Sequence, residues 1–334
     1  LDKGETYNFS MWVKKLGFAG KAEVFIRGAR SVLSTVAEIE LSGNGGEWVK
    51  VSCSVKALET QMGRLVIIFK GNGHIGVDCV SLLPSKVWGD PDKYRNGKLS
   101  PRIVKVLKDC HPSFFRFPGG CVVEGDEIFD NMYKWRNTVG ALEERRQIAN
   151  TWGYMQSYGV GFYEYFALCE DLKMTPLPVL HCGLLCQIRV GEQRGEGYRR
   201  IMPGTKEFKH EVIDNVADLL FFALGSADSE DANEAHWAKV RAEMGHPAPF
   251  ELKYVGIGNE NWGNEYFENF DACLMGLRQY EYAGRQTDLI EKFGVTIVTT
   301  AGVDIRPQDS NDSWKVINKK YRDTIVDEHV YNSY

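Results

Sequence analysis

The chain has 334 residues, 43% of them hydrophobic and 12% aromatic, so it can bury one large core or two smaller ones. Its formal net charge of −5 comes without a basic stripe, which argues against a nucleic-acid partner. No apolar run reaches the roughly 18 residues of a membrane span, and the start LDKGETYNFS does not resemble a signal peptide. Because that start lacks a Met and runs directly into a strand-like segment, we expect the chain to be cut at its front.

The first 85 or so residues predict an all-β domain. Short alternating segments separated by Gly, Asn and charged turns predict strands at 7–15, 21–28, 32–42, 46–55, 63–71 and 75–84. Strands at this spacing indicate an antiparallel, jelly-roll-like sandwich, N-terminally incomplete, over residues 1–85. The Pro-, Gly- and Asn-rich stretch that follows predicts a linker over residues 86–100.

From residue 101 onward the pattern changes to alternating helices and strands. Helices are expected at 100–112, 161–174, 211–225, about 266–293 and 312–322, and strands at 113–120, 175–183, 252–260, 294–302 and 324–334. This alternation predicts an α/β domain with a parallel sheet. Five strands are too few to close an eight-stranded barrel. An open doubly wound sheet stays an alternative, although no Gly-rich phosphate loop follows any strand.

Polar residues gather where these strands end. Arg116 lies among phenylalanines in FFRFPGG, where a guanidinium needs a carboxylate or a bound ligand, so a structural ion pair and a binding role both stay open. Asn259 and Glu260 close the apolar run LKYVGIG. His329 and Tyr331 are two residues apart on the last strand and share one of its faces. Such strand ends are where α/β barrels keep their chemistry.

Glycoside hydrolysis requires two carboxylates, one of which must stay protonated near neutral pH. Glu260 suits the proton donor, because the amide of Asn259 could hold a neighbouring sugar hydroxyl. The alternation of the last strand places Asp327 with His329 and turns Glu328 toward the helices. Two other candidates for the second carboxylate are Glu265, expected on a solvated turn, and Glu124, on a loop that could line a pocket. The chain thus offers one good acid and no convincing nucleophile.

Eight cysteines in a chain of this length do not make a disulfide scaffold. Cys182 and Cys186 follow His181 closely enough to suggest a metal site, but no second Cys/His cluster supports that interpretation. Burial as small hydrophobes is therefore the favoured interpretation of these cysteines.

Five ordered motifs resemble α-L-arabinofuranosidases of glycoside hydrolase family 51: FFRFPGGCVVEGD, YKWRNTVGALEERR, TWGYMQSYGVGFYEYFALCEDLKMTPLPV, YVGIGNENWG and VDEHVYNS. The likeness is closest to the branch with a carbohydrate-binding-like β-sandwich inserted near the start of the catalytic barrel. GHIGVDCVSLLP and EWVKVS are similar to the end of that sandwich. The resemblance covers essentially the whole chain.

The resemblance implies a (β/α)8 (TIM) barrel, of which residues 101–334 would supply about strands two to six, and a retaining mechanism without cofactor. It makes Glu260 the general acid/base and implies substrate-binding roles for Arg116, Cys121, Asn259, His329 and Tyr331. Arg116 matches the arginine that supports the nucleophile. Cys121 stands where some members have Asn, which leaves one sugar contact open.

The family's nucleophilic Glu follows its seventh strand, beyond the His-x-Tyr motif, so we expect the nucleophile to be absent from this chain. The implied parent enzyme removes terminal α-L-arabinofuranosyl residues from arabinan, arabinoxylan or related oligosaccharides. The 334 residues alone are expected to be inactive and to fold poorly. No membrane partner is expected, family habit suggests a homo-oligomer, and an extracellular location is favoured over a cytoplasmic one.

Two alternatives stay open. The protein could be a non-catalytic carbohydrate-binding protein whose sandwich offers Trp12 or Trp48 as a sugar platform, although packing is the commoner use of such residues. It could also be another retaining barrel glycosidase with the same Asn-Glu strand end, such as a xylanase or a β-galactosidase.

Overall fold

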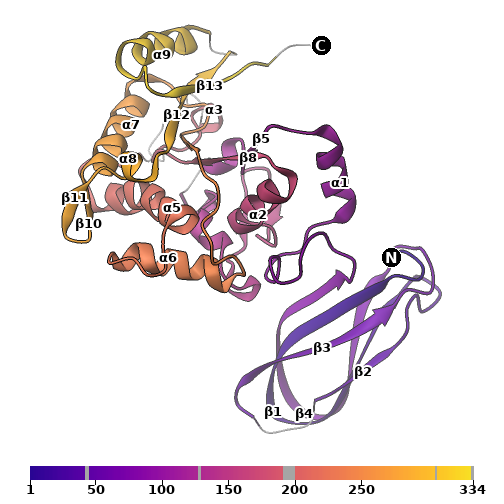
Figure 1. Cartoon of the computed structure of the whole chain (residues 1–334). Helices are drawn as coiled ribbons and strands as arrows, with labels where there is room; N and C mark the ends of the chain where they lie inside the picture. Colours follow the sequence, from indigo (N-terminus) through magenta and orange to yellow (C-terminus); the bar gives the residue numbers. More distant parts are fainter. Residues whose placement is uncertain (42–44, 127–128, 191–199, 305–306, 332–334) are drawn as a thin grey trace. The chain divides into compact units, whose positions relative to one another are not determined.

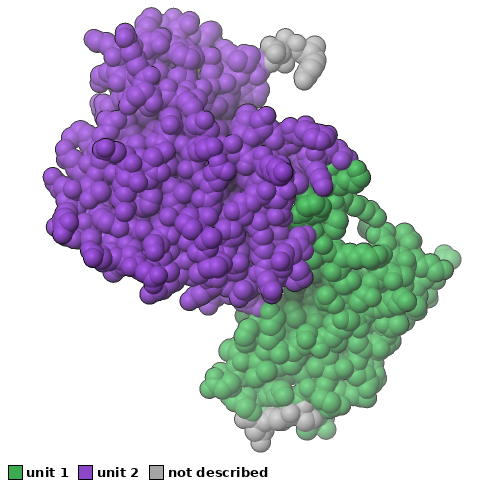
Figure 2. Space-filling model, viewed as in Figure 1, with its two compact units in different colours: residues 1–88, 98–105 green, residues 89–97, 106–334 purple. Residues whose placement is uncertain are grey.

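The computed structural model describes residues 1–41, 45–126, 129–190, 200–304 and 307–331. The chain divides into two compact units, one of residues 1–88 and 98–105 and the other of residues 89–97 and 106–334 (Figure 2). Within the described ranges, no helix has both the length and the apolar character needed to cross a membrane. The assignment of residues 1–85, 86–100 and 101–334 to a carbohydrate-binding-like domain, a linker and a catalytic domain stays a prediction.

Unit 1 is built on one antiparallel four-stranded sheet. Its strands are β1 (Thr6–Arg27), β2 (Ala37–Glu40), β3 (Trp48–Lys56) and β4 (Arg64–Pro84). β1 pairs with β3 and β2 along one edge and with β4 along the other (Figure 1). The prediction of an antiparallel all-β region is therefore confirmed at this level.

Two of the strands are long and bent, where the sequence predicted two short strands each. Residues 7–15 and 21–28 both belong to β1, and residues 63–71 and 75–84 both belong to β4. Gly20 and Gly71 face each other at the bend, and a Cβ on either would lie 2.1 Å from a carbonyl oxygen of the opposite strand. The glycines therefore allow the two backbones to approach closely and the pairing to continue, instead of ending the strands. The strand predicted at 32–42 is shortened to the four residues of β2.

The core of unit 1 shows how the bend is accommodated. Phe9, Met11 and Val13 point inward before the bend, whereas Ala22 and Val24 do so after it. This change from odd to even positions coincides with a register shift between Leu16 and Ala19 in the β1–β4 pair. One irregularity thus keeps both halves of a 22-residue strand facing the same core.

The two tryptophans considered as a sugar platform both lie on this sheet, Trp12 in β1 and Trp48 in β3. Trp48 is 44% exposed, and its ring packs over Gly76, where a Cβ would come within 3.2 Å of the indole. The position is partly open and partly occupied by packing, so sugar binding there stays a prediction.

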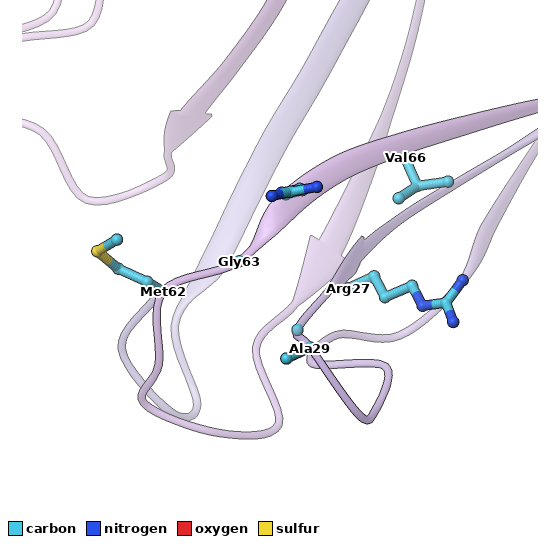
Figure 3. A pocket seen from close by; sticks show the side chains of 7 residues that line it. Arg27, Ala29, Met62, Gly63 and Val66 are labelled. Carbon is cyan, nitrogen blue, oxygen red and sulfur yellow. The ribbon is translucent and has the colours of Figure 1, made fainter.

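An open pocket of about 570 Å³ lies where β1 ends and β4 begins. Arg27, Arg64 and Val66 line it together with the loop residues Gly28, Ala29, Met62 and Gly63, and Met62 extends away from the other labelled side chains (Figure 3). None of the predicted site residues belongs to this lining.

Unit 2 contains a parallel five-stranded sheet whose spatial order follows the chain. The strands are β5 (Phe114–Phe117), β8 (Thr175–Leu180), β9 (Tyr254–Ile257), β12 (Thr296–Val303) and β13 (Ile325–His329). The predicted parallel sheet of five strands is confirmed. A doubly wound sheet requires a reversal of strand order, and the order β5-β8-β9-β12-β13 contains none, so that alternative is wrong.

Helices connect these strands (Figure 1). The α-helices are α1 (Pro101–Cys110), α2 (Phe162–Leu172), α3 (Gln187–Val190), α4 (Lys206–Phe208), α5 (Asp214–Leu224), α6 (Ala232–Glu243), α7 (Gly263–Arg278), α8 (Leu289–Phe293) and α9 (Pro307–Lys320). A π-helical turn, η5 (Lys209–Ile213), joins α4 to α5. Short 3-10 turns are η1 (Cys121–Val123), η2 (Phe129–Asn131), η3 (Trp135–Thr138) and η4 (Leu142–Glu144), and two-residue strands are β6 (Ile148–Ala149) and β7 (Met155–Gln156).

The helical stretch predicted at about 266–293 is wrong in its middle. A small hairpin of β10 (Tyr280–Tyr282) and β11 (Arg285–Thr287) separates α7 from α8. Its turn uses Ala283 and Gly284, both at positive φ, which a helix cannot continue through. In α1 the predicted face of Ile103, Val106 and Leu107 forms, but Ile103 and Val106 are 65% and 63% exposed.

Candidate active site

The predicted site residues lie at the carboxyl edge of the parallel sheet. Arg116 belongs to β5, Asn259 and Glu260 directly follow β9, and His329 is the last residue of β13, with Tyr331 just beyond. Parallel strands end on the same edge, so three strands far apart in sequence deliver these side chains to one region. The strand β9 ends at Ile257 because Gly258 adopts a φ of 92° and Glu260 one of 55°.

The sheet must be strongly curled for its two edge strands to share a site. β5 and β13 are separated by three strands, so in a flat sheet they would stand about 19 Å apart. Yet Arg116 on β5 donates from Nε to Oδ2 of Asp327 on β13 at 2.9 Å. The sheet is therefore a half-barrel whose open side is spanned by side chains.

Glu260 stands at the centre of the cluster. Its side chain is 4% exposed, and its Oε1 accepts hydrogen bonds from the Tyr331 hydroxyl at 2.6 Å and from His329 Nδ1 at 2.8 Å. Its Oε2 accepts a weaker contact from the Cys121 thiol at 3.8 Å. All three neighbours are residues predicted from the sequence, and they converge on one carboxylate.

Arg116 has the carboxylate partner that its apolar surroundings demanded. Both Nε and Nη2 lie 2.9 Å from Asp327 Oδ2, and Nη2 also donates to Oδ1 of Asn259 at 3.0 Å. The structural ion pair therefore exists, and the same guanidinium orients a site amide. Asn259 is fully buried, with its amide nitrogen 3.4 Å from Oε2 of Glu124, so its contact with a sugar hydroxyl stays a prediction.

His329 is held between two carboxylates. Its Nδ1 faces Glu260 at 2.8 Å and its Nε2 faces Asp327 at 3.4 Å, so both ring nitrogens donate and the ring is an imidazolium. The hydrogen bonds to Asp327 and Glu260 raise the pKa of His329 to about 9. For Asp327, burial would raise the pKa, but the hydrogen bond from His329 and the charge of Arg116 hold it below its usual value.

The same surroundings lower the pKa of Glu260, whereas a proton donor is expected to have a raised pKa. Burial would raise the pKa of Glu260, but hydrogen bonds from His329 and Tyr331 and the charges of His329 and Arg116 lower it. The described residues thus stabilise a carboxylate, and the expectation that they keep it protonated is wrong. The reason is that the two groups hydrogen-bonded to its Oε1 are both donors, and one of them, His329, is a cation.

The other carboxylates considered for the nucleophile are all engaged elsewhere. Glu328 points to the helical layer as predicted, where its Oε1 accepts from Ser310 of α9 at 2.5 Å. Glu265 is half-buried in the first turn of α7. Glu124 is 1% exposed, so it does not line an open pocket, and its Oε1 accepts from Asn261 at 2.5 Å. Glu328 and Glu124 are thus bound to other groups, and neither serves as the second carboxylate of Glu260.

Residues that the sequence did not single out lie directly below the Glu260 turn. Asn261 and Gln187 are buried and hydrogen-bonded to each other, Asn261 Nδ2 to Gln187 Oε1 at 3.2 Å. The tripeptide Asn259-Glu260-Asn261 shows two amides flanking the acid, which was the available signal for Asn261. Gln187 carries no such signal, because it begins α3, far away in the chain.

Cys121 contacts Cys186 as well as Glu260. The hydrogen bond with Cys186 lowers the pKa of the Cys121 thiol to about 7, with Arg189 acting in the same direction. Cys182 and Cys186 are buried, as predicted, and burial lowers the pKa of His181 to about 4, so that imidazole is neutral. No group of three or more His, Cys, Asp or Glu side chains in the part of the chain that the structure describes could hold a metal ion.

Comparison with known proteins points to one family. Residues 106–334 match the alpha-L-arabinofuranosidase 1 domain. The chain is 33% identical over 347 residues to the extracellular exo-alpha-L-arabinofuranosidase of Streptomyces chartreusis, a match that covers 100% of this chain and 37% of that protein. It is 33% identical over 270 residues to alpha-L-arabinofuranosidase 2 of Arabidopsis thaliana, covering 80% of this chain and 36% of that protein. The chain therefore spans little more than a third of the length of these relatives.

Among solved structures, an arabinose-bound family 51 α-L-arabinofuranosidase superposes with a TM-score of 0.69 over 90% of this chain and 44% of that one. The sequence identity of this pair is 23%, so the likeness concerns the fold. It supports an α/β architecture with a curled parallel sheet.

Proposed function

The chain belongs to the α-L-arabinofuranosidases of glycoside hydrolase family 51, and from this membership we propose that the protein removes terminal α-L-arabinofuranosyl residues from arabinan, arabinoxylan or related oligosaccharides. The observation that carries the proposal is the cluster around Glu260, where His329, Tyr331 and Cys121 contact one buried carboxylate. The guanidinium of Arg116 donates a hydrogen bond to the neighbouring Asn259 and orients its amide.

Glu260 is the general acid/base of this mechanism. In the first step its carboxyl group donates a proton to the departing glycosidic oxygen, while a second carboxylate attacks the anomeric carbon and forms a glycosyl ester. In the second step the Glu260 carboxylate takes a proton from water, whose oxygen displaces the ester and releases arabinose. Arg116, Cys121, Asn259, His329 and Tyr331 would contact the sugar or hold the groups that do.

The nucleophile is expected outside the described residues, on the strand that follows β13 in the family's barrel. A carboxylate placed there would add negative charge beside Glu260 and raise its pKa, which the residues described above hold down. We therefore propose that the acid form of Glu260 depends on the nucleophile.

The finer architecture follows the same membership. β5, β8, β9, β12 and β13 would be strands two to six of a (β/α)8 barrel, and unit 1 would be part of a jelly-roll-like, carbohydrate-binding-like sandwich. A relative from Streptomyces chartreusis is named extracellular, and we propose that location here as well. A homo-oligomer is proposed only from family habit.

The decisive test is hydrolysis of a panel of 4-nitrophenyl glycosides by the full-length protein and its Glu260→Gln variant. The proposal requires release from the α-L-arabinofuranoside, strongly reduced by the substitution, and little release from β-xyloside and β-galactoside. Preference for either of the latter would favour a different retaining glycosidase. No hydrolysis of any substrate, combined with retention of unit 1 on arabinoxylan in affinity electrophoresis, would favour a carbohydrate-binding protein.

A further inference from the structure

The carboxylate of Glu124 lies beneath the turn that carries Glu260. Glu124 is 1% exposed and caps the short turn η1 that also contains Cys121. Its Oε1 accepts from Nδ2 of Asn261 at 2.5 Å, and its Oε2 accepts a longer contact from Nδ2 of Asn259 at 3.4 Å. One buried acid thus touches the residues on both sides of the proposed general acid/base.

Asn261 transmits this contact to the backbone of the turn. Its Oδ1 accepts from the backbone N–H of Asn259 at 3.0 Å, while its Nδ2 is shared between Glu124 and Gln187. Gln187 in turn binds the backbone of Trp262: its Oε1 accepts from the N–H and its Nε2 donates to the carbonyl, both at 3.1 Å. The backbone is therefore held on either side of Glu260 by one continuous set of buried side chains.

The turn needs this support because its backbone is strained. Glu260 has a φ of 55°, in the left-handed region that a residue with a side chain rarely adopts. Such a conformation is unfavourable by itself and persists only where the surroundings fix it. Strain of this kind concentrates at functional sites, where it aims a side chain that regular structure would direct elsewhere.

We infer that Glu124 is a positioning residue for the reaction, which acts through Asn261 and Asn259 to hold the Glu260 turn in its strained, productive conformation. The inference rests on the proposed function, because it assumes that Glu260 delivers a proton to the leaving group.

Glu124 acts through the polarity of its contacts more than through the volume of its side chain. Both neighbours present NH₂ groups, so position 124 must offer each of them an acceptor; burial raises the pKa of Glu124, while the two amide contacts favour its carboxylate form. Glu124→Gln keeps the shape but turns one acceptor into a donor, which then faces an amide NH₂. Rotating the Asn261 amide would not help, since its Oδ1 already accepts from Asn259 and its Nδ2 serves Gln187. Buried mismatches of this type cost more than the loss of one hydrogen bond.

The experiment compares three variants of the full-length protein on two substrates. The variants are Glu124→Gln, the double change Glu124→Gln with Asn261→Asp, and Glu234→Gln as a control for removing a buried carboxylate in the same unit. Glu234 is 4% exposed and accepts from the backbone N–H of Ser226 at 2.9 Å. The substrates are an alkyl α-L-arabinofuranoside, whose leaving group needs protonation, and the 2,4-dinitrophenyl analogue, whose leaving group does not.

If Glu124 positions Glu260, its loss should slow the hydrolysis of the alkyl glycoside much more than that of the dinitrophenyl glycoside. Glu124→Gln is expected to lower kcat/KM for the alkyl glycoside by about tenfold to a hundredfold and for the dinitrophenyl glycoside by about threefold at most. In the double variant the new carboxylate at position 261 accepts from the new amide at 124 but loses the bond to Gln187 Oε1, so only part of the loss should be recovered. Equal losses on both substrates, or a double variant worse than the single one, would overturn the inference.

Hydrogen exchange separates this inference from the proposed function. The N–H of Asn259 and of Trp262 are bonded to Asn261 and Gln187, so Glu124→Gln should speed their exchange about tenfold, and the double variant should slow that of Asn259 again. Unchanged exchange in Glu124→Gln would show that Glu124 does not hold the Glu260 turn, whether or not the enzyme is active. If Glu124→Gln changes the exchange but the wild-type protein hydrolyses neither substrate, the role of Glu124 in holding the turn stands and the proposed glycosidase function is rejected.

Discussion

Arg116 and Asp327 form an ion pair at 2.9 Å although they come from opposite edges of the five-stranded sheet. The guanidinium also binds Asn259, so this one side chain connects β5, β13 and the turn after β9. The pair is mostly buried, with 18% and 22% of the two side chains exposed. It therefore contributes both to the curl of the sheet and to the arrangement around Glu260.

Arg116→Lys tests that double role. A lysine ammonium keeps the charge but cannot hold Asp327 and Asn259 at once in the fork geometry of a guanidinium. We expect a loss of stability of about 2 kcal/mol, since hydrogen bonds to charged groups are worth about 1.5–3 kcal/mol. Urea denaturation measures it, with Lys253→Arg as a comparison at an exposed ion pair. A variant as stable as the wild type would show that the pair does not hold the sheet edges.

Glu260→Gln should abolish the proton transfer without disturbing the fold. The amide cannot donate an acidic proton, and general acid–base groups contribute about 10²–10⁴-fold to rate. We expect a loss of that order in kcat on an aryl α-L-arabinofuranoside, with an unchanged circular dichroism spectrum. Glu265→Gln, on the neighbouring helix α7, is the matched control and should retain activity within about twofold. Similar losses in both variants would remove Glu260 from its proposed role.

Much of this arrangement was predictable from the sequence, because it depends on local patterns. The strand ends at Arg116, Asn259 and His329 follow from apolar runs that stop at polar residues, and the alternation in β13 placed Glu328 on the helical side. The helix α6 was missed because its apolar face is weak, although Asp231 caps it through two backbone N–H groups. Asp-x-x-Glu was the available signal there.

Contacts between distant segments could not be predicted in this way. The contact of Asn261 with Glu124 joins residues 137 positions apart, and that with Gln187 joins residues 74 apart. No periodicity in the sequence encodes such a pairing. The lowered pKa of Glu260 escaped prediction for the same reason, since it follows from the donors that β13 brings to the carboxylate.

The His329 cluster should make stability depend on pH. The folded-state pKa of His329 is raised from 6.5 to about 9, so its stabilising effect is complete below 6.5 and is lost as the pH rises toward 9. The pKa values of Glu260 and Asp327 are lowered from 4.5 and 3.8, so their effect is present above those values and is lost in acid. The cluster therefore stabilises most between about pH 5 and 6.5.

Melting temperatures of the wild type and His329→Gln, measured from pH 5 to 10, check this prediction. The difference between the two proteins should be largest below pH 6.5 and should shrink above pH 9. Since Asp327 and Glu260 are the groups that face the imidazole, a difference that stays constant with pH would show that the ring is neutral in the folded protein.

Cys121 should be a reactive thiol next to the acid. Its pKa of about 7 means that thiol and thiolate forms coexist at neutral pH, whereas the hydrogen bond with Cys121 and burial raise the pKa of Cys186. Iodoacetamide should therefore alkylate Cys121 with a rate that reaches half its maximum near pH 7, while Cys186 stays unmodified. Peptide mapping by mass spectrometry with time gives both rates, and Cys121→Ser removes the signal. Preferential labelling of Cys186 would contradict the assignment.

The ion pair of Arg145 and Glu164 should be a large contribution to the stability of unit 2. Both side chains are fully buried, and two guanidinium nitrogens reach the carboxylate at 2.8 and 3.0 Å. The same carboxylate accepts the N–H of Gly161 at 2.8 Å, so it also caps α2.

Glu164→Gln leaves an unpaired buried cation, which costs about 3–5 kcal/mol. Glu243→Gln, at the exposed end of α6, should stay within about 0.5 kcal/mol of the wild type in the same urea titration. Because the pair lies apart from the Glu260 cluster in its contacts, kcat per folded molecule should not change; a fall in kcat with unaltered stability would mean that this pair serves the active site instead.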